Sequence, residues 1–496
     1  MSPTGPAHLQ AYPGATTCVV LGRMTAGSPL DLAAFRAVLW CVDDGGRGEP
    51  PLVAAGAPLL AVRVETAGAL DAALGDFLRR DARHLPSVYV MADALEARAA
   101  AYQPSMAVLF AELEGQHRAR VTRQQDGFRW QQHVIRNLPF YARRRVPALW
   151  RDALRGLPAV VCGAGPSLDV SGPKLAALAP GCVVFAADSA LRALARHGVA
   201  ADFAVSIDVA KLPEKCLPES HRPPRVILSA VSPPEWNDAL PNGSAAYAAS
   251  RQITTDWLAA AGVGRPPLTA TETCGSTALD LARFLGCAPI HLFGMDLALS
   301  AKQRHAAGAD RSIYAASGFV AEQAFPEVPG NYSPTVPTHA LTDWRDLDAR
   351  LAEWPPGLVF NVNDRGARLR NATLVHPDRL TSLPPADKAR ALAALSAPET
   401  ADPVVLENAL APVRAAGQGI GAALPGLRAA LTRGSPEAVI VGLRGLLADG
   451  NTGRALGAYA LKLMPHLLPP TEGDIAFWQT QLDELTELSL LMQAVH

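Results

Sequence analysis

The sequence predicts an α/β protein: a Rossmann-like central domain with a mostly parallel sheet, a small N-terminal α/β module and a C-terminal helical domain. Three observations support this prediction. Short apolar runs alternate with helix-length segments in the middle of the chain, a glycine loop follows the first run, and the C-terminal part is rich in Ala and Leu. The 496 residues exceed the roughly 250–300 at which one hydrophobic core stops growing, so several domains are expected. We place them at 1–117 (N-terminal module), 118–155 (helical connector), 156–383 (Rossmann-like domain) and 384–496 (helical domain).

The N-terminal module is predicted from apolar runs at 17–22 and 87–92, between Pro- and Gly-containing turns. The connector carries ten arginines from Arg118 to Arg155 against two aspartates, and apolar side chains recur there at helical spacing. The arginines fit either a solvated helix face or contact with a phosphate or an acidic acceptor, and both interpretations stay open.

In the central domain, the apolar runs predict parallel strands, and the segments between them predict the helices that cover both faces of the sheet. This alternation with short connections is typical of a doubly wound sheet. The expected strands are 158–162, 182–187, 203–207, 226–229 and 290–293, and the expected helices are 166–179, 189–197 and 276–285.

The C-terminal region is predicted to be helical beyond Pro384 and Pro385, which mark the domain boundary. Its last apolar residues are spaced by three and four, as on one face of a helix. They are Ile475, Trp478, Leu482, Leu485, Leu488 and Met492. This stripe fits the interior of a helical domain or, as the alternative, a surface that binds a partner.

Charge and cysteine content narrow the function classes. A net charge of −1 without a block of like charge argues against a general nucleic-acid binder or a polybasic membrane-binding surface. No run of 18 or more apolar residues occurs, and Met1 to Tyr12 lack a signal-peptide pattern, so neither a membrane span nor export by that route is expected. The seven cysteines form no C-x-x-C pair, which predicts reduced, mostly buried thiols and a cytoplasmic location.

The loop Gly163–Asp169 (Gly-Ala-Gly-Pro-Ser-Leu-Asp) connects the first strand to its helix. Its glycines permit a tight turn and a close approach to a ligand, and the first free N–H groups of a helix favour an anion. We therefore expect a nucleotide phosphate at Gly163, Ala164, Gly165, Pro166 and Ser167, with Pro166 at the first helical position. The loop lacks the third glycine of the dinucleotide-binding pattern, so a dehydrogenase is not favoured.

Ligands of doubly wound sheets bind at the carboxyl ends of the strands, where Asp188, Ser206 and Asp208 are expected beside the glycine loop. We assign these three residues to nucleotide binding. Each aspartate also fits a second role as a helix cap, which the sequence leaves open.

Further candidates follow later strands. Asp296 comes directly after the strand 290–293, on the same rim. His305 is a candidate general base because imidazole titrates near neutral pH, although a lone loop histidine also occurs without a function. Ser276 and Thr277, at the start of a predicted helix, are expected on the substrate side.

Taken in order, these segments resemble the motility-associated factor (Maf) flagellin glycosyltransferases, whose central domain is shared with archaeal hydroxymethylpterin diphosphokinases. The resemblance covers roughly residues 125–375, and the glycine loop is also similar to that of bacterial sialyltransferases. It rests on the segments 130–139 (with Arg-Asn-Leu-Pro), 163–169, 187–208, 275–287, 294–298 with His305, and 361–368.

The resemblance implies transfer of a pseudaminic- or legionaminic-type (nonulosonic) acid from a CMP-sugar to Ser or Thr of flagellin before export, with no required metal or other cofactor. By position, the glycine loop would hold the CMP phosphate, and Asp188 and Asp208 would approach the ribose and cytosine. Asp296 and His305 would line the sugar and acceptor side as the catalytic pair. Two segments depart from the family: Met295 stands where Gln is usual, and 361–368 keeps only part of the Thr-x-Gly-Gly-Ala pattern.

Two other functions remain as alternatives. An ATP-dependent pyrophosphokinase of a pterin-like alcohol would need Mg²⁺ held by acidic side chains. The diphosphokinase branch looks to place a pair of aspartates where this chain has Ser206 and Asp208, which argues against that chemistry. A non-catalytic adaptor that binds a nucleotide or flagellin is the other alternative.

Overall fold

The computed structural model describes most of the chain, and every structural statement below concerns the described residues. They are 7–10, 15–23, 32–42, 59–63, 67–78, 80–81, 84–91, 94, 98–250, 256–299, 305–309, 326–380, 387–467 and 474–496. The chain divides into two compact units, Met1–Gln125 with Leu461–Glu472 and Asp126–Ala460 with Gly473–His496.

The first unit contains a five-stranded sheet in the order β1-β5-β2-β3-β4, parallel except between β1 and β5. Its strands are β1 (Ala7–Gln10), β2 (Thr17–Leu21), β3 (Ala37–Val42), β4 (Leu59–Arg63) and β5 (Ser87–Val90). Helix α1 (Ala67–Leu78) and the beginning of α3 (Ala99–Arg143) share a core with this sheet, because Phe77 and Tyr102 cluster with Val19 and Leu39. The expected strands at 17–22 and 87–92 are confirmed as β2 and β5.

The second unit is built on an eight-stranded sheet, parallel throughout, in the order β10-β9-β8-β7-β6-β11-β14-β15. The predicted doubly wound sheet is therefore confirmed. Five strands were expected: β6 (Ala159–Cys162), β7 (Val183–Ala187), β8 (Phe203–Ser206), β9 (Val226–Leu228) and β11 (Ile290–Phe293). Three were not: β10 (Ala245–Tyr247), β14 (Val359–Val362) and β15 (Ala372–Val375).

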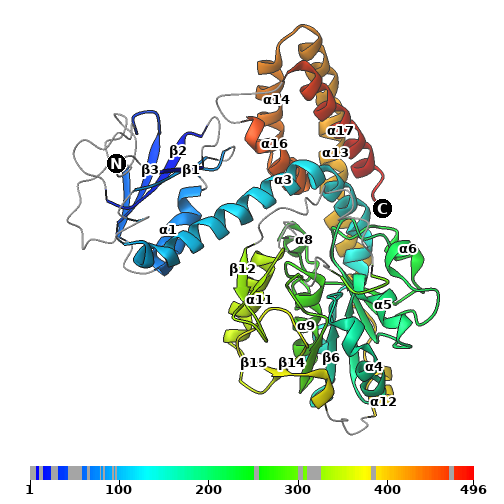
Figure 1. Ribbon diagram of the computed structural model, residues 1–496. Helices are drawn as coiled ribbons and strands as arrows, with labels where there is room; N and C mark the ends of the chain where they lie inside the picture. Colours follow the sequence, from blue (N-terminus) through cyan, green and yellow to red (C-terminus); the bar gives the residue numbers. More distant parts are fainter. Residues whose placement is uncertain are drawn as a thin grey trace. The chain divides into compact units, whose positions relative to one another are not determined.

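Helices cover both faces of this sheet, and Figure 1 shows α4 and α9 on opposite sides of β6. Every residue of β6 is buried, as expected for a strand covered on both faces, and Val161 clusters with Leu281 of α9. The α-helices of this part are α4 (Leu168–Leu178), α5 (Leu191–Arg196), α6 (Pro213–Cys216), α7 (Trp236–Ala239), α8 (Asp256–Ala260), α9 (Cys274–Phe284), α11 (Leu341–Ala352) and α12 (Lys388–Ala393). Its 3₁₀ turns are η1 (Ala148–Trp150), η2 (Ala179–Gly181), η3 (Asp188–Ala190) and η4 (Pro377–Arg379). Helix α4 begins at Leu168 with Ser167 as its N-cap, so the expected place of Pro166 at the first helical position was wrong.

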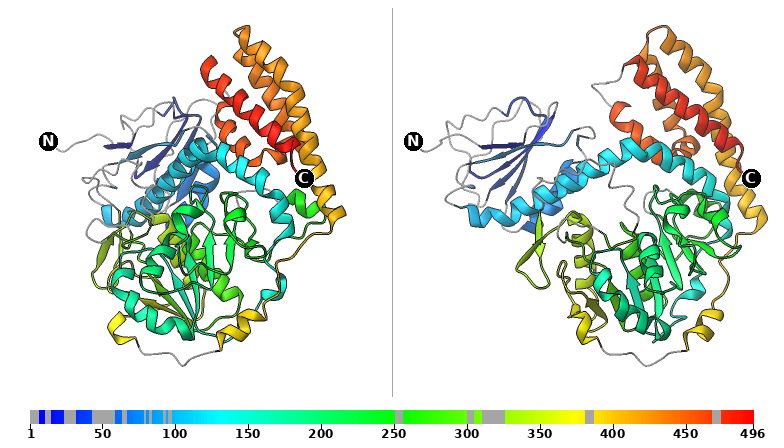
Figure 2. Two further views of the ribbon diagram at one scale, coloured as in Figure 1. Left: turned by 90° about the vertical axis from the view of Figure 1, so that its right-hand side faces the viewer. Right: turned by 45° about the vertical axis from the view of Figure 1, so that its right-hand side comes forward.

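The C-terminal segment is helical, as predicted, with α13 (Pro403–Thr432), α14 (Pro436–Ala448), α15 (Gly450–Ala455), α16 (Gly457–Leu467) and α17 (Ile475–Gln493). Helices α13 and α17 run side by side (Figure 2). At their contact, a Cβ on Gly417 would lie 2.7 Å from the Cβ of Met492, so the crossing requires a glycine. The predicted apolar stripe packs inside, except for Ile475, which is 54% exposed.

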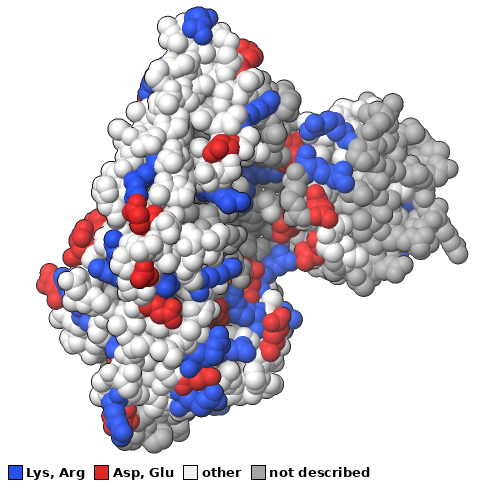
Figure 3. Space-filling view, turned by 180° about the vertical axis from the view of Figure 1, so that it is seen from behind, with Lys and Arg blue, Asp and Glu red and all other residues white. Residues whose placement is uncertain are grey.

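Three surface and composition findings complete the description. Six of the seven cysteines are buried and Cys274 is half-buried, so the expectation of mostly buried thiols is confirmed. Basic and acidic side chains are interspersed on the face shown in Figure 3, in keeping with the balanced composition. Within the described residues, no helix combines the length and the apolar character needed to cross a membrane.

Candidate functional site

The strand order of the parallel sheet reverses between β6 and β11, because β7 to β10 extend it on one side and β14 and β15 on the other. Open α/β sheets bind their ligands in the crevice at such a switch point, outside the carboxyl ends of the strands. The glycine loop follows β6, and Gly294–Asp296 follow β11. The structure therefore brings the predicted loop and Asp296 together at the switch point.

The two segments pack backbone against backbone. The Gly163 N–H donates to the Phe293 carbonyl at 2.8 Å, and the Gly165 N–H donates to the Gly294 carbonyl at 2.7 Å. A Cβ on Gly163 would lie 2.5 Å from the Gly294 oxygen, and one on Gly294, whose φ is +61°, would lie 2.4 Å from the Gly163 oxygen. We call Gly163, Gly165 and Gly294 the glycine clasp. These backbone contacts alone require glycine at the three positions, whether or not a ligand binds there.

Asp296 is buried, with 2% of its surface exposed, and its side chain is hydrogen-bonded to the glycine loop. Its carboxylate accepts hydrogen bonds from the Ser167 N–H at 2.8 Å, from the Ser167 hydroxyl and from Asn363 Nδ2 at 3.0 Å. Burial raises its pKa, while the bonds from Ser167 and Asn363 and the charge of Arg365 lower it. Of the backbone N–H groups in residues 163–167, that of Ala164 has no hydrogen-bond partner among the described residues.

Asp188 and Ser206 meet at the carboxyl ends of β7 and β8. The Ser206 hydroxyl donates to Asp188 Oδ2 at 2.8 Å, and the Ser189 N–H donates to Oδ1 at 2.6 Å. The Cys274 thiol lies 3.5 Å from the same Oδ2. The pKa of Asp188 is raised to about 6, first by burial and then by the charge of Asp208, while the charge of Lys211 and the bonds from Ser206 and Ser189 oppose the rise.

Asp208 is exposed on the same rim, where its Oδ1 accepts from the Ala210 N–H at 2.9 Å. Close by, Lys211 has only 5% of its surface exposed, and its charge acts on Asp188. The sequence reasoning missed Lys211, although a lysine three residues after a rim aspartate was the available signal. The ends of β7 and β8 therefore combine the buried carboxylate of Asp188, the exposed carboxylate of Asp208 and the buried ammonium group of Lys211.

Ser276 and Thr277, expected on the substrate side, lie at the N-terminus of α9 in a network of hydroxyl groups. The Ser276 N–H donates to the Thr273 hydroxyl, which caps the helix, and the hydroxyls of Ser276 and Thr277 contact that of Thr271 at 2.9 and 2.8 Å. Both side chains are buried, so in this structure they stabilise the helix end beside Asp188.

His305 begins the described segment 305–309, which lies against the glycine loop. The Ala306 N–H donates to the Ala164 carbonyl at 2.8 Å, and the Ala307 N–H donates to Asp169 Oδ1 at 3.0 Å. The half-buried His305 is therefore next to the loop, as the sequence prediction requires. Asp169, in the first turn of α4, holds this segment in place.

Two segments that carry the resemblance acquire a structural explanation. In the Arg-Asn-Leu-Pro motif, the fully buried Asn137 donates to the carbonyls of Ala230 and Ser232 at 3.0 and 2.7 Å and accepts from the Tyr247 hydroxyl at 3.1 Å. It thereby ties α3 to the turn after β9. In the segment 361–368, Asn363 holds Asp296, a role that the sequence reasoning did not assign.

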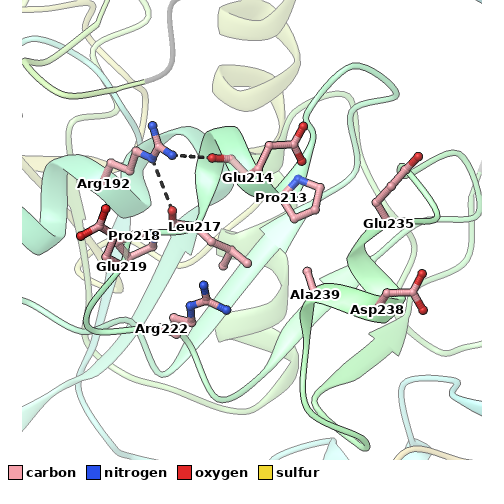
Figure 4. A pocket seen from close by; sticks show the side chains of 10 residues that line it. All are labelled: Arg192, Pro213, Glu214, Leu217, Pro218, Glu219, Arg222, Glu235, Asp238 and Ala239. Atoms are coloured by element: carbon pink, nitrogen blue, oxygen red, sulfur yellow. Dashed lines mark hydrogen bonds between the residues drawn. The ribbon is translucent and has the colours of Figure 1, made fainter.

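A cavity of about 610 Å³ lies outside the carboxyl ends of β7 to β9 (Figure 4). Arg192 of α5 donates from Nε to the Leu217 carbonyl at 3.4 Å and from Nη2 to the Glu214 carbonyl. These two hydrogen bonds connect α5 with the segment 214–217 at the cavity wall. The volume suits a small-molecule ligand. Neither Asp188 nor Asp208 lines the cavity, whose walls are Arg192, Pro213, Glu214, Leu217, Pro218, Glu219, Arg222, Glu235, Asp238 and Ala239.

Comparisons with known proteins bear on the family resemblance and the fold. Residues 132–302 match the family model described as 6-hydroxymethylpterin diphosphokinase MptE-like. A solved structure of a Maf glycosyltransferase from Magnetospirillum magneticum AMB-1 is similar with a TM-score of 0.54 and 16% identity, over 99% of this chain and 80% of the other. No curated protein matches the sequence significantly. The resemblance inferred from the sequence is confirmed: the central segment matches the diphosphokinase-like family model, and the chain has the fold of a Maf glycosyltransferase.

Proposed function

We propose that the chain transfers a nonulosonic acid of the pseudaminic or legionaminic type from its CMP-activated form to a serine or threonine of flagellin. The observation that carries this proposal is the cluster of Asp188, Ser206 and Asp208 on the rim that also holds the glycine clasp. Carboxylate oxygens accept hydrogen bonds from the hydroxyls of a ribose. A nucleoside bound there would point its phosphate toward the switch point.

The chemistry follows from the placement of these groups. The bond between the anomeric carbon and the phosphate oxygen breaks, CMP leaves with the electron pair, and an acceptor hydroxyl forms the new bond to that carbon. The Ala164 N–H would donate to the departing phosphate, where negative charge develops. His305, held beside the loop, would take the proton of the acceptor hydroxyl. Asp296 would position the loop, because its carboxylate is bonded to Ser167 and Asn363.

A ligand-binding experiment tests the proposal. We expect CMP or a CMP-sugar to raise the melting temperature without Mg²⁺, since a ligand at about 100 times its Kd stabilises the native state by about 2.7 kcal/mol. We expect Asp208→Ala to abolish nucleotide binding and His305→Ala to keep binding while slowing transfer. Glu353→Gln, which changes an exposed carboxylate at the end of α11 that does not line the cavity, serves as the control. Absence of any response to cytidine nucleotides would contradict the proposal.

The acceptor needs a separate test. Intact-mass analysis of flagellin from cells with and without this gene should show the mass of the sugar acid only when the gene is present. Equal masses would contradict flagellin as the acceptor.

A pyrophosphokinase acting on a pterin-like alcohol is the second candidate, favoured by the match of residues 132–302 to the diphosphokinase-like family model. Under this alternative, ATP with Mg²⁺ would stabilise the chain and cytidine nucleotides would not. Ser206 argues against it, because its hydroxyl donates to Asp188 at the position where a second carboxylate would be needed for a metal. A non-catalytic adaptor would bind CMP without transferring the sugar.

A further inference from the structure

A small hairpin places a tyrosine at the edge of the candidate site. Strands β12 (Glu327–Pro329) and β13 (Thr335–Pro337) are antiparallel, and their connecting turn lies against the segment after β14. The Asn331 N–H donates to the Gly366 carbonyl at 3.0 Å, and Asn331 Nδ2 donates to the Arg365 carbonyl at 2.6 Å. The tip of the hairpin is therefore fixed on the loop that carries Asn363 and Arg365.

Tyr332, at this tip, is 53% exposed although both ends of its side chain are held. Its hydroxyl donates to the Asn363 carbonyl at 2.9 Å, and its ring meets that of His376 edge-on, with 6.0 Å between the centroids. A single exposed aromatic side chain is common on protein surfaces. This one, however, is fixed beside Asn363, whose side chain binds Asp296 at the glycine clasp.

Arg365 is the cationic group of the same loop, which is bonded to Asp296. The Arg365 N–H donates to Asn363 Oδ1 at 3.0 Å, and the Ala367 N–H donates to the Asp296 carbonyl at 2.8 Å. The Arg365 side chain donates from Nε to Asp364 Oδ1 at 2.8 Å and from Nη2 to Oδ2, and this pairing is the main cause of its raised pKa. The side chain is 37% exposed, and a guanidinium carries five N–H donors, so it can bind a second carboxylate beside Asp364.

We propose that Tyr332 and Arg365 form the subsite for the sugar acid, in which Arg365 binds the carboxylate of the donor and the Tyr332 ring covers the apolar face of its pyranose. The inference rests on the proposed function, which places the donor phosphate at the glycine loop. In a CMP-nonulosonic acid, the carboxylate and the phosphate oxygen are attached to the same carbon. Arg365 belongs to the loop on the rim that is bonded to Asp296, so its guanidinium is within reach of that carboxylate.

The test compares two ligands on the full-length chain, CMP and CMP-N-acetylneuraminic acid, by isothermal titration calorimetry. Arg365→Gln should weaken binding of the CMP-sugar at least about tenfold, the loss of one charge-assisted contact, and leave CMP binding within twofold. Arg368→Gln, an exposed arginine of the same segment, is the matched control and should change neither affinity. Tyr332→Ala should weaken binding of the CMP-sugar about fivefold. Tyr332→Phe keeps the ring and should weaken this binding by less than about 2.5-fold.

The outcomes separate the subsite from the proposed function. If Arg365→Gln weakens the binding of CMP and of the CMP-sugar equally, or weakens neither, the subsite is overturned. Binding of cytidine ligands by the wild type still supports the proposed function in that case. A wild type that binds neither cytidine ligand rejects the proposed function. Saturation-transfer NMR with free N-acetylneuraminic acid and its methyl ester then examines the subsite directly. Binding that needs the carboxylate and is lost in Arg365→Gln supports the subsite, and any other pattern overturns it.

Discussion

Replacement of Asp188 by asparagine should stabilise the chain while weakening nucleotide binding. Asp188 is 1% exposed, and its pKa rises from the usual 3.8 to about 6, first through burial and then through the charge of Asp208. The folded state therefore binds this proton more tightly than the unfolded state does, so ionisation lowers stability. The cost is absent below about pH 3.8, grows as the pH rises, and is complete above about pH 6.

The magnitude follows from the shift of about two units at about 1.4 kcal/mol per unit, which gives about 3 kcal/mol at pH 8 and roughly half of that at pH 5. Asparagine has the same shape and carries no charge, and its amide oxygen can still accept from the Ser189 N–H. Asp188→Asn should recover this free energy. Its affinity for CMP should fall, because an amide is a weaker acceptor for the ribose hydroxyls than a carboxylate.

Urea unfolding at pH 5 and pH 8, followed by tryptophan fluorescence, measures the effect. Asp238→Asn is the control, an exposed aspartate on the same side of the sheet whose replacement should change stability by less than about 0.5 kcal/mol. If Asp188→Asn gains nothing at pH 8, or gains the same amount at both pH values, the assignment of a costly buried charge is refuted.

Three further changes test the packing of the site. Gly165→Ala should lower the free energy of unfolding by about 1–3 kcal/mol, because the new Cβ would lie 2.6 Å from the Gly294 oxygen. The control Gly264→Ala places its Cβ in open space, so it should leave the free energy of unfolding nearly unchanged in the same assay. Asn137→Ala should cost at least about 2 kcal/mol, since it leaves two buried carbonyls and a hydroxyl without their partner; an unchanged melting temperature would contradict this role. Lys388→Met should cost about 1–3 kcal/mol, because Nζ donates to two carbonyls and to a carboxylate, and Lys388→Arg should restore part of the loss in a melting experiment.

The parts of the sheet that the sequence predicted are those whose strands are apolar on both faces. β6, β7, β8 and β11 are completely buried; the runs of β6 and β7 are apolar throughout, and those of β8 and β11 contain one polar residue each, Ser206 and His291. β14 escaped prediction because Asn361 interrupts its apolar pattern, and β15 because two of its four residues are exposed. The short β10 has only three residues, two of them alanines, so no apolar run signals it.

The candidate site shows a similar division. The rule that ligands bind at the carboxyl ends of strands placed Asp188, Asp208 and Asp296 on one rim, because it depends only on strand order. It could not reveal that Asp296 faces inward, because its partners Ser167 and Asn363 lie 129 and 67 residues away in the chain. The burial of Lys211 was hidden for the same reason, since it depends on elements packed around it.

The glycine clasp gives the glycines of the loop a structural cause that does not depend on any ligand. Gly163 and Gly165 are required by the Gly294 turn, and a side chain at any of the three positions would collide with backbone or Asp296 atoms of the opposite segment. A protein that keeps this crossing must keep the glycines, whatever ligand it binds. Under the proposed function, Asp188 and Asp208 at the ends of β7 and β8 are then the residues whose exchange would alter nucleotide preference without disturbing the sheet.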